Sequence, residues 1–132
     1  MIVVDTNVIT YLLISGEHSQ QAEKLLRHDP HWIAPFLWRS EFRNVLSLYM
    51  RKGFISLELA MRLSEHAEQL MSNNEFDISS SDVLKFVQYS ECSAYDCEFV
   101  ALATQFKVLL YTMDEKILRA FPNTAQPLTA IY

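Results

Sequence analysis

The chain alternates short, continuous apolar runs with longer stretches in which apolar residues recur every three or four positions. A continuous apolar run is typical of a strand buried on both faces of a parallel sheet, and the longer spacing is typical of an amphipathic helix. The pattern predicts strands at residues 2–4, 32–34, 75–78 and 108–111, with a last edge strand at 127–131.

Helices are predicted between these strands, and several have recognisable ends. Ser56 and Ser93 are well placed as N-caps, Gly53 has the position of a C-terminal glycine, and Pro30 and Pro122 follow helices that they would stop. The predicted helices cover residues 8–14, 19–27, 36–52, 56–72, 79–90 and 115–121, with a further helix that begins at 93. Strands that alternate with helices predict the α/β class, a mostly parallel sheet with helices on both faces.

Composition supports one compact domain over residues 1–132, because half of the residues are apolar and only 2 are glycine and 4 proline. No apolar stretch approaches the length that spans a bilayer, and Asp5 interrupts the N-terminal apolar run, so neither a membrane helix nor a signal peptide is expected. Cys92 and Cys97 lack zinc-ligand spacing and are interpreted as free thiols of a soluble, cytoplasmic protein.

Four acidic residues are unusual for their positions. Asp5 directly follows the first strand, and Asp114 comes shortly after the strand at 108–111. Glu41 and Asp96 each interrupt the apolar stripe of a predicted helix, where an unpaired charge would be costly to bury. Any one of them has an ordinary explanation: Asp114 and Asp96 as helix caps, Glu41 as a salt-bridge partner of a neighbouring arginine.

All four together favour a shared site, because clustered carboxylates repel one another unless a cation neutralises them. Hard oxygen ligands without nearby cysteine or histidine suit Mg²⁺ or Mn²⁺ better than Zn²⁺. The four histidines lack ligand spacing and are interpreted as solvated surface residues. Carboxylates that hold Mg²⁺ are typical of phosphoryl chemistry.

The order of these motifs resembles the PIN domain, and within it the VapC-like toxin ribonucleases of type II toxin–antitoxin pairs. The segments that carry the resemblance are Val4-Asp5-Thr6-Asn7-Val8, Ser40-Glu41-Phe42, Tyr95-Asp96 before an alanine-rich helix, and Thr112-Met113-Asp114. Each segment is weak alone, but the four in this order cover essentially the whole chain and are specific.

The resemblance implies a three-layer α/β/α sandwich with a five-stranded, mostly parallel sheet. It also implies metal-dependent cleavage of RNA, often of a structured RNA such as a transfer RNA, by a homodimer whose antitoxin covers the site. Asp5, Glu41, Asp96 and Asp114 would be the catalytic Mg²⁺ or Mn²⁺ ligands. The supporting positions, which would orient an acid or a bound water, are Thr6, Asn7 and Thr112.

The net charge of −5 and the isoelectric point of about 5.3 depart from what an RNA-cleaving toxin is expected to have, since nucleic-acid binding normally leaves a basic footprint. Arg39 and Arg43, one turn apart around Glu41, are candidate contacts to RNA or to an acidic antitoxin. The other basic residues that could contribute to a local patch are Arg51, Lys52, Lys85, Lys107, Lys116 and Arg119.

Three other functions would each require different features of the sequence. A phosphatase with Asp5 as nucleophile would need a second aspartate two residues later, where the chain has Asn7. A receiver domain would need an acidic pair before its phospho-acceptor and a lysine late in the sheet, and neither is found. The third alternative, a PIN-like module that mainly binds a partner and has weak or no nuclease activity, is compatible with the sequence. The helix at 56–72 is more apolar than one buried face needs, which favours a dimer or antitoxin interface as much as plain core packing.

Overall fold

The structure is a computed structural model that describes residues 1–131. One or two helices separate each strand from the next along the chain, as the apolar pattern predicts. Their order is β1 (Ile2–Val4), α1 (Thr6–Leu13), α2 (Ser19–His28), β2 (Trp32–Pro35), α3 (Leu37–Arg51), α4 (Leu57–Leu70), β3 (Glu75–Phe76), α5 (Ser80–Tyr89), α6 (Ala94–Phe106), β4 (Leu110–Tyr111), α7 (Glu115–Ala120) and β5 (Ala125–Gln126), followed by a 3-10 turn at Leu128–Ala130.

The five strands form one sheet in the order β3-β2-β1-β4-β5, and every neighbouring pair is parallel. β1 lies at the centre, with Val4 opposite Tyr111 of β4. The chain leaves β1 toward β2 on one side, while β4 lies on the other, so the connections diverge between β1 and β4. In open parallel sheets the crevice outside the carboxyl ends of such strands is the usual place for a ligand.

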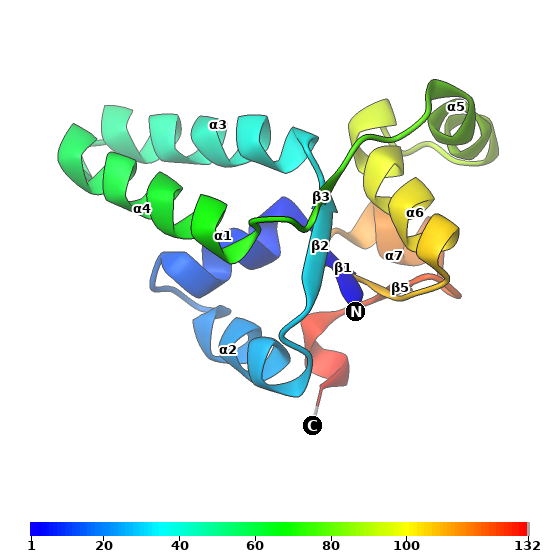
Figure 1. The fold of residues 1–132 in the computed structure, drawn as a ribbon, viewed down its shortest axis with the longest axis horizontal. Coiled ribbons are helices and arrows are strands. Elements are labelled where there is room, and N and C mark those ends of the chain that lie inside the picture. The colour runs from blue at the N-terminus through cyan, green and yellow to red at the C-terminus, as the bar shows by residue number, and fades with distance from the viewer. Residues whose placement is uncertain (132) are drawn as a thin grey trace.

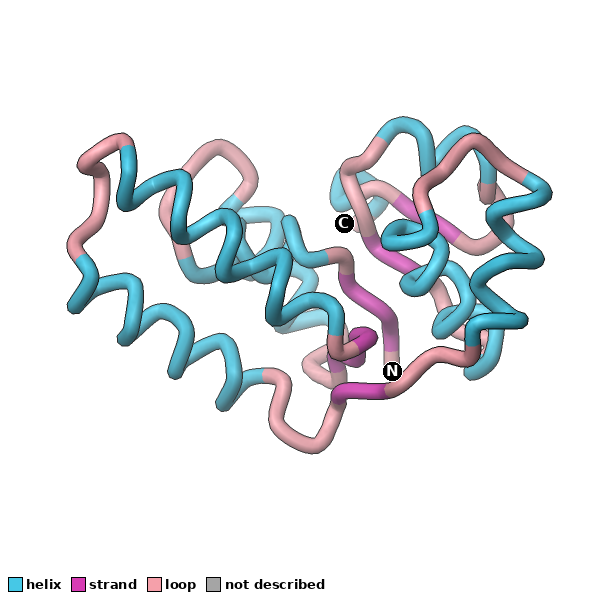
Figure 2. The backbone as a smooth tube through the Cα atoms, turned by 90° about the horizontal axis from the view of Figure 1, so that it is seen from above, coloured by secondary structure: helices cyan, strands magenta, loops and turns pink. Residues whose placement is uncertain are grey.

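The helices form two layers, one on each face of the sheet. α1 to α4 lie on one side and α5 to α7 on the other, as Figure 1 shows and the view from above in Figure 2 confirms. α3 and α4 pack side by side and extend together beyond the sheet (Figure 2). The predicted three-layer α/β/α fold is therefore confirmed. Within residues 1–131, every helix is too short or too polar to cross a bilayer.

The sequence explains how the central layer is built. The residues of β1 are all β-branched and buried, which suits an interior strand with helices on both faces. α6 packs against β1, β2 and β4, and its buried small residues Ala101 and Ala103 allow close approach to the sheet. Together these contacts fix the positions at which β1 and β4 end.

Several predicted element ends are confirmed and one element is wrong. The Ser56 hydroxyl accepts a hydrogen bond from the amide of Leu59, and Gly53 follows α3 with φ of +76°. The last strand, predicted at residues 127–131, is instead Ala125–Gln126, and a 3-10 turn follows. Pro127 has no amide hydrogen to donate to the sheet, which is consistent with pairing that stops at Gln126.

Candidate functional site

Two strand-end acids meet at the carboxyl edge of β1 and β4 through a single hydroxyl group. Thr112 follows β4 and is fully buried; its Oγ1 donates a hydrogen bond to Oδ2 of Asp5 over 2.7 Å. Oγ1 of Thr112 also accepts a hydrogen bond from the backbone amide of Asp114 at 3.0 Å. Because β1 and β4 are parallel neighbours, Asp5 and Asp114 lie at the same edge of the sheet.

The turn from β1 into α1 connects Asp5 with the long helix α3. Asp5 caps α1, because its Oδ1 accepts the amide of Thr6 at 2.7 Å. The hydroxyl of Thr6 donates to Oε1 of Glu41 on α3, also over 2.7 Å. Residues 5 and 6 therefore hold two carboxylates in fixed positions relative to each other.

The four acids singled out by sequence line one cavity of about 570 Å³. Its walls come from the β1–α1 turn, the first half of α3, the start of α6 and the loop before α7. The lining residues are Asp5, Thr6, Asn7, Leu37, Ser40, Glu41, Asn44, Val45, Tyr95, Asp96 and Asp114. All of the predicted site residues except Thr112, Arg39 and Arg43 line this cavity. Thr112 lies directly beneath it, where it binds Asp5.

The carboxylates interact electrostatically from one end of the cavity to the other. Burial raises the pKa of Asp5 to about 6, and the negative charges of Glu41 and Asp96 add to that rise against the hydrogen bonds from Thr112 and Thr6. Burial also raises the pKa of Glu41, with a further contribution from Asp96. The pKa of Asp96 is raised by burial and then by the charge of Asp114.

The ordinary explanations for two of these acids also hold in the structure. Asp114 caps α7, with its Oδ1 accepting the amides of Lys116 at 2.8 Å and Ile117 at 3.2 Å. Asp96 lies in the first turn of α6, and its amide donates to the hydroxyl of the N-cap residue Ser93. A capping acid keeps a second carboxylate oxygen, so capping and a role in the cavity are compatible.

The donor set suits a hard divalent cation, although its side chains are not gathered into a coordination shell. Carboxylate and hydroxyl oxygens line the cavity, with no sulfur or imidazole among them, and such donors prefer Mg²⁺ or Mn²⁺. Among residues 1–131, no three acidic, histidine or cysteine side chains lie close enough to hold one ion together. Hydrogen bonds to Thr6 and Thr112 hold Asp5 and Glu41 in their positions.

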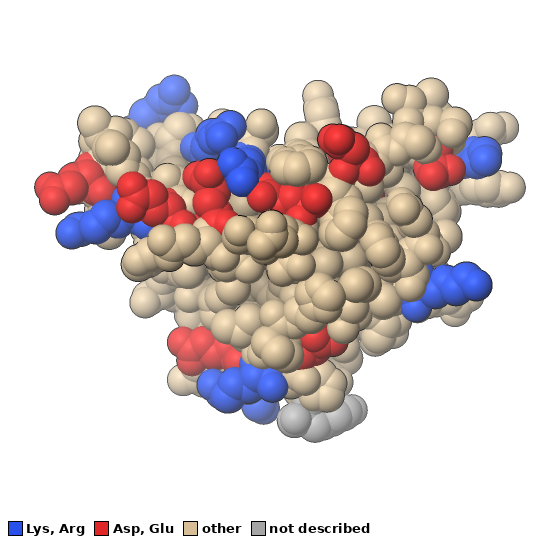
Figure 3. All heavy atoms as spheres, in the orientation of Figure 1, with Lys and Arg blue, Asp and Glu red and all other residues tan. Residues whose placement is uncertain are grey.

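Arg39 and Arg43 lie on a different side of α3 from Glu41. They line a shallow recess against Ser64 and Glu68 of α4. Arg39 forms salt bridges with Glu75 over 2.6 Å and with Glu68 over 2.8 Å, whereas Arg43 is exposed. On the face drawn in Figure 3, basic and acidic side chains alternate over α3 and α4. The proposed contact with RNA or antitoxin therefore stays a prediction, and for Arg39 a structural role is already evident.

The structure adds cavity residues that sequence reasoning did not single out. Ser40 and Asn44 flank Glu41 on the cavity side of α3, and the ring of Tyr95 is 62% exposed at the rim. Glu98, which lines a separate recess on the other side of Tyr95, is a further half-buried acid whose pKa is raised by burial and by the charge of Glu41. Ser40 and Asn44 could have been found from helical spacing, since they lie one residue before and three after Glu41; for Glu98 the sequence has no such signal.

Comparison with protein families identifies a match to the PIN domain that spans residues 2–122. No curated protein matches the chain. The fold resembles PAE2754 from Pyrobaculum aerophilum, with a TM-score of 0.77 and 18% identity over 98% of this chain and 91% of the other.

Two further solved structures share the fold. FitAcB from Neisseria gonorrhoeae matches with a TM-score of 0.77 and 18% identity over 98% of this chain and 99% of the other. A toxin–antitoxin complex from Klebsiella pneumoniae matches with a TM-score of 0.69 and 16% identity over 97% and 98%.

Proposed function

Because the chain belongs to the PIN domain family, we propose that it is a Mg²⁺- or Mn²⁺-dependent endoribonuclease and the toxin of a type II toxin–antitoxin pair. The observation that carries the proposal is the cavity in which Asp5, Glu41, Asp96 and Asp114 converge from four separate segments. A purely structural role would not require four acids in a single hollow, where the charges of Glu41 and Asp96 raise the pKa of Asp5 and the charge of Asp114 raises the pKa of Asp96.

In this proposal the four carboxylates hold the cation, and the neighbouring hydroxyl groups keep them in place. Thr112 and the amide of Thr6 fix both oxygens of Asp5, and the hydroxyl of Thr6 fixes Glu41. Asn7, exposed at the cavity, is available to orient a water or the RNA strand. A bound divalent cation supplies charge neutralisation at the phosphate and lowers the pKa of the attacking water.

The partner part of the proposal rests on the neighbours in fold and on exposed apolar side chains. One neighbour is described as a toxin–antitoxin complex. Leu57 and Met61, one turn apart on α4, are 62% and 56% exposed, and Phe54, three residues before Leu57, is 70% exposed. This surface suits a homodimer contact or an antitoxin. Light scattering that finds only monomers at high concentration would contradict the dimer.

The central test is cleavage of RNA by the purified chain with Mg²⁺, with Mn²⁺ and with chelator. We expect endonucleolytic products in either metal and none with chelator. Asp5→Asn and Asp96→Asn should each reduce the cleavage rate by at least about a hundredfold, as expected when a ligand of a catalytic metal is lost. Asp77, an exposed acid outside the cavity, offers the matched control Asp77→Asn, which should cleave at the parent rate.

The alternative is a PIN-like module that acts mainly by binding a partner, with weak or no nuclease activity. The observation that favours it is that, among residues 1–131, the acids are not gathered closely enough to hold an ion. Calorimetry separates the two functions: a nuclease of this kind binds Mn²⁺ at the carboxylate cavity, and Asp5→Asn weakens that binding. Parent-level RNA cleavage by Asp5→Asn would overturn the proposed metal site.

A further inference from the structure

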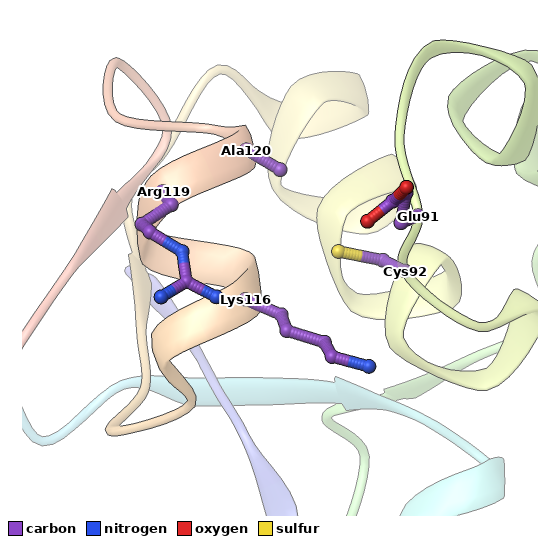
Figure 4. Close-up of a pocket in the computed structure, with 5 residues that line it drawn as sticks. All are labelled: Glu91, Cys92, Lys116, Arg119 and Ala120. Carbon is purple, nitrogen blue, oxygen red and sulfur yellow. The ribbon is translucent and has the colours of Figure 1, made fainter.

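A second, smaller cavity lies between α7 and the segment that leads into α6. Its volume is about 230 Å³, and it is lined by Glu91, Cys92, Lys116, Arg119 and Ala120. Figure 4 shows Lys116 extending from α7 toward the segment that carries Glu91 and Cys92, while Arg119 lies along α7. Lys116 is therefore the basic side chain that reaches across this cavity.

A backbone hydrogen bond links Lys116 to Asp114, which lines the carboxylate cavity. Its amide donates to Oδ1 of Asp114 over 2.8 Å, so the start of α7 holds the lysine at a fixed offset from that acid. The opposite wall of the smaller cavity ends at Ser93, whose hydroxyl caps α6 and accepts the amide of Asp96 at 3.0 Å. Both walls thus continue into segments that carry proposed metal ligands.

Lys116 is also free to bind an anion. It is exposed and forms no salt bridge with any of residues 1–131, in contrast to Arg39, which is held by Glu68 and Glu75.

An RNA strand that crosses an acidic cavity needs a cation beside the metal site. A chain with a net charge of −5 attracts RNA poorly as a whole, so a phosphate next to the scissile one must be held by a local positive charge. The cavity at Lys116 is smaller than the roughly 300–1,000 Å³ typical of small-molecule pockets, which suits a phosphate group better than a whole nucleotide.

We propose that Lys116 binds a backbone phosphate of the RNA that flanks the scissile phosphate, with the smaller cavity between α7 and residues 91–92 as its subsite. The inference rests on the proposed ribonuclease function and names the contact that positions its substrate. Glu91 lies at the same cavity and opposes phosphate binding, so the two residues should have effects of opposite sign.

The first test measures RNA binding without divalent metal, where no cleavage is expected, by fluorescence anisotropy over a range of salt concentrations. Lys116→Ala should weaken binding on the order of tenfold at low salt and flatten the plot of log affinity against log salt by about 0.7, the value for one phosphate of a single strand. Lys116→Arg should restore most of the affinity, and Glu91→Gln should increase it.

Lys85→Ala is the matched control, because Lys85 is exposed on α5 and lines a separate recess with Thr104 and Gln105 near the far end of α6. It should leave affinity and salt slope unchanged. An equal slope for Lys116→Ala and the parent, or no RNA binding by the parent, overturns the inference. A Lys116-dependent slope without metal-dependent cleavage would support the phosphate contact at Lys116 and contradict the ribonuclease function, so the two failures are distinguishable.

The second test places the contact on the RNA. In an oligonucleotide that the parent chain cleaves at one site, each flanking phosphate is replaced in turn by an uncharged methylphosphonate. At one flanking position the replacement should lower kcat/KM for the parent by about tenfold but cause no further loss in Lys116→Ala, as for two partners of one contact. Independent, multiplying losses at every position would contradict the assignment.

Discussion

At the scale of single residues, the site depends on hydroxyl groups that hold carboxylates in place. Thr112 donates to Asp5 and accepts from the amide of Asp114, so one buried oxygen links the ends of two strands. Thr6 links Asp5 and Glu41 through its amide and its hydroxyl. Such fixed positions reduce the rearrangement that a bound cation requires.

The charge of Asp5 should destabilise the metal-free chain at neutral pH. Its pKa is raised in the folded state, from an ordinary value near 4 to about 6, so folding favours the protonated form. The protonated Asp5 carboxyl therefore contributes its full stabilisation of the folded state below about pH 4, and this contribution is lost as the pH rises through 6. We expect Asp5→Asn to be more stable than the parent by about 1–3 kcal/mol at pH 7, measured by urea unfolding with chelator present.

The pH dependence identifies the cause of that gain. The difference between Asp5→Asn and the parent should shrink toward zero as the pH falls through 4, because Asp5 is then protonated in the folded state and becomes protonated in the unfolded state as well. Asp77→Asn, at an exposed acid outside the cavity, should change stability by no more than about 0.5 kcal/mol at either pH. A gain from Asp5→Asn that is the same at pH 4 and pH 7 would contradict the electrostatic explanation.

The acids of the cavity could be predicted from the sequence because they occupy positions where the local pattern favours apolar residues. Asp5 follows a buried strand, and Glu41 and Asp96 interrupt apolar stripes. The hydrogen bond from Thr112 to Asp5 was harder to predict, because Thr112 lies 107 residues away and its partner depends on the β1–β4 register. Register is a property of the assembled sheet, which local sequence does not determine.

At the scale of elements, α3 has two sides with different tasks. One side presents Glu41 to the carboxylate cavity. The other presents Arg39, whose Nε and Nη2 donate to the two carboxylate oxygens of Glu75 while Nη1 donates to Glu68. Trp38 donates its indole N–H to the same Glu75. These bonds join α3 to β3 and α4, so they hold the helix that carries Glu41.

The main effect of removing Arg39 should therefore be a loss of stability, and not the loss of a direct contact with a ligand. The Glu75 side chain is only 6% exposed, and Arg39→Ala would leave its charge with the Trp38 indole as its remaining side-chain donor. We expect a loss of about 2–3 kcal/mol in the free energy of unfolding, measured by urea denaturation. Arg39→Lys should restore only part of it, because an ammonium group cannot reproduce the paired hydrogen bonds of the guanidinium.

Arg43, one turn further along the same side of α3, is the matched control. It is exposed and makes no salt bridge within the described chain, so Arg43→Ala should change stability by no more than about 0.5 kcal/mol. Equal losses from the two substitutions would show that the Glu75 contacts contribute little. If Arg43→Ala weakens RNA or antitoxin binding at unchanged stability, the original prediction for this residue holds.

Helical geometry explains why the sequence was informative about Glu41 and less so about Arg39. Successive residues are about 100° apart, so Arg39 and Arg43 share a side that is roughly opposite to Glu41. Proximity in sequence suggested that the arginines flank the acid, whereas the helix separates them. The last strand was misplaced for a similar reason: its apolar content was read without the missing amide of Pro127.

At the scale of the whole molecule, charge sets how the site can operate. The chain carries 16 acidic and 11 basic residues, and four of the acids face one cavity. Metal binding there must compete with protons, because burial and mutual repulsion raise the pKa of Asp5, Glu41 and Asp96. The cavity is partly protonated near pH 6, so a cation that binds there as proposed must displace those protons.

The affinity for Mn²⁺ should accordingly increase as the pH rises. Below pH 6, where Asp5 is mostly protonated, we expect a loss of affinity that approaches about tenfold per pH unit, and a steeper loss where Glu41 or Asp96 is also protonated. Calorimetry at pH 6 in two buffers of different ionisation enthalpy should detect about half a proton or more released per ion bound, since Asp5 is then half protonated. An affinity that is constant between pH 5 and pH 7, with no proton released, would exclude Asp5 as a ligand, because an ion bound elsewhere would leave the carboxylate cavity protonated.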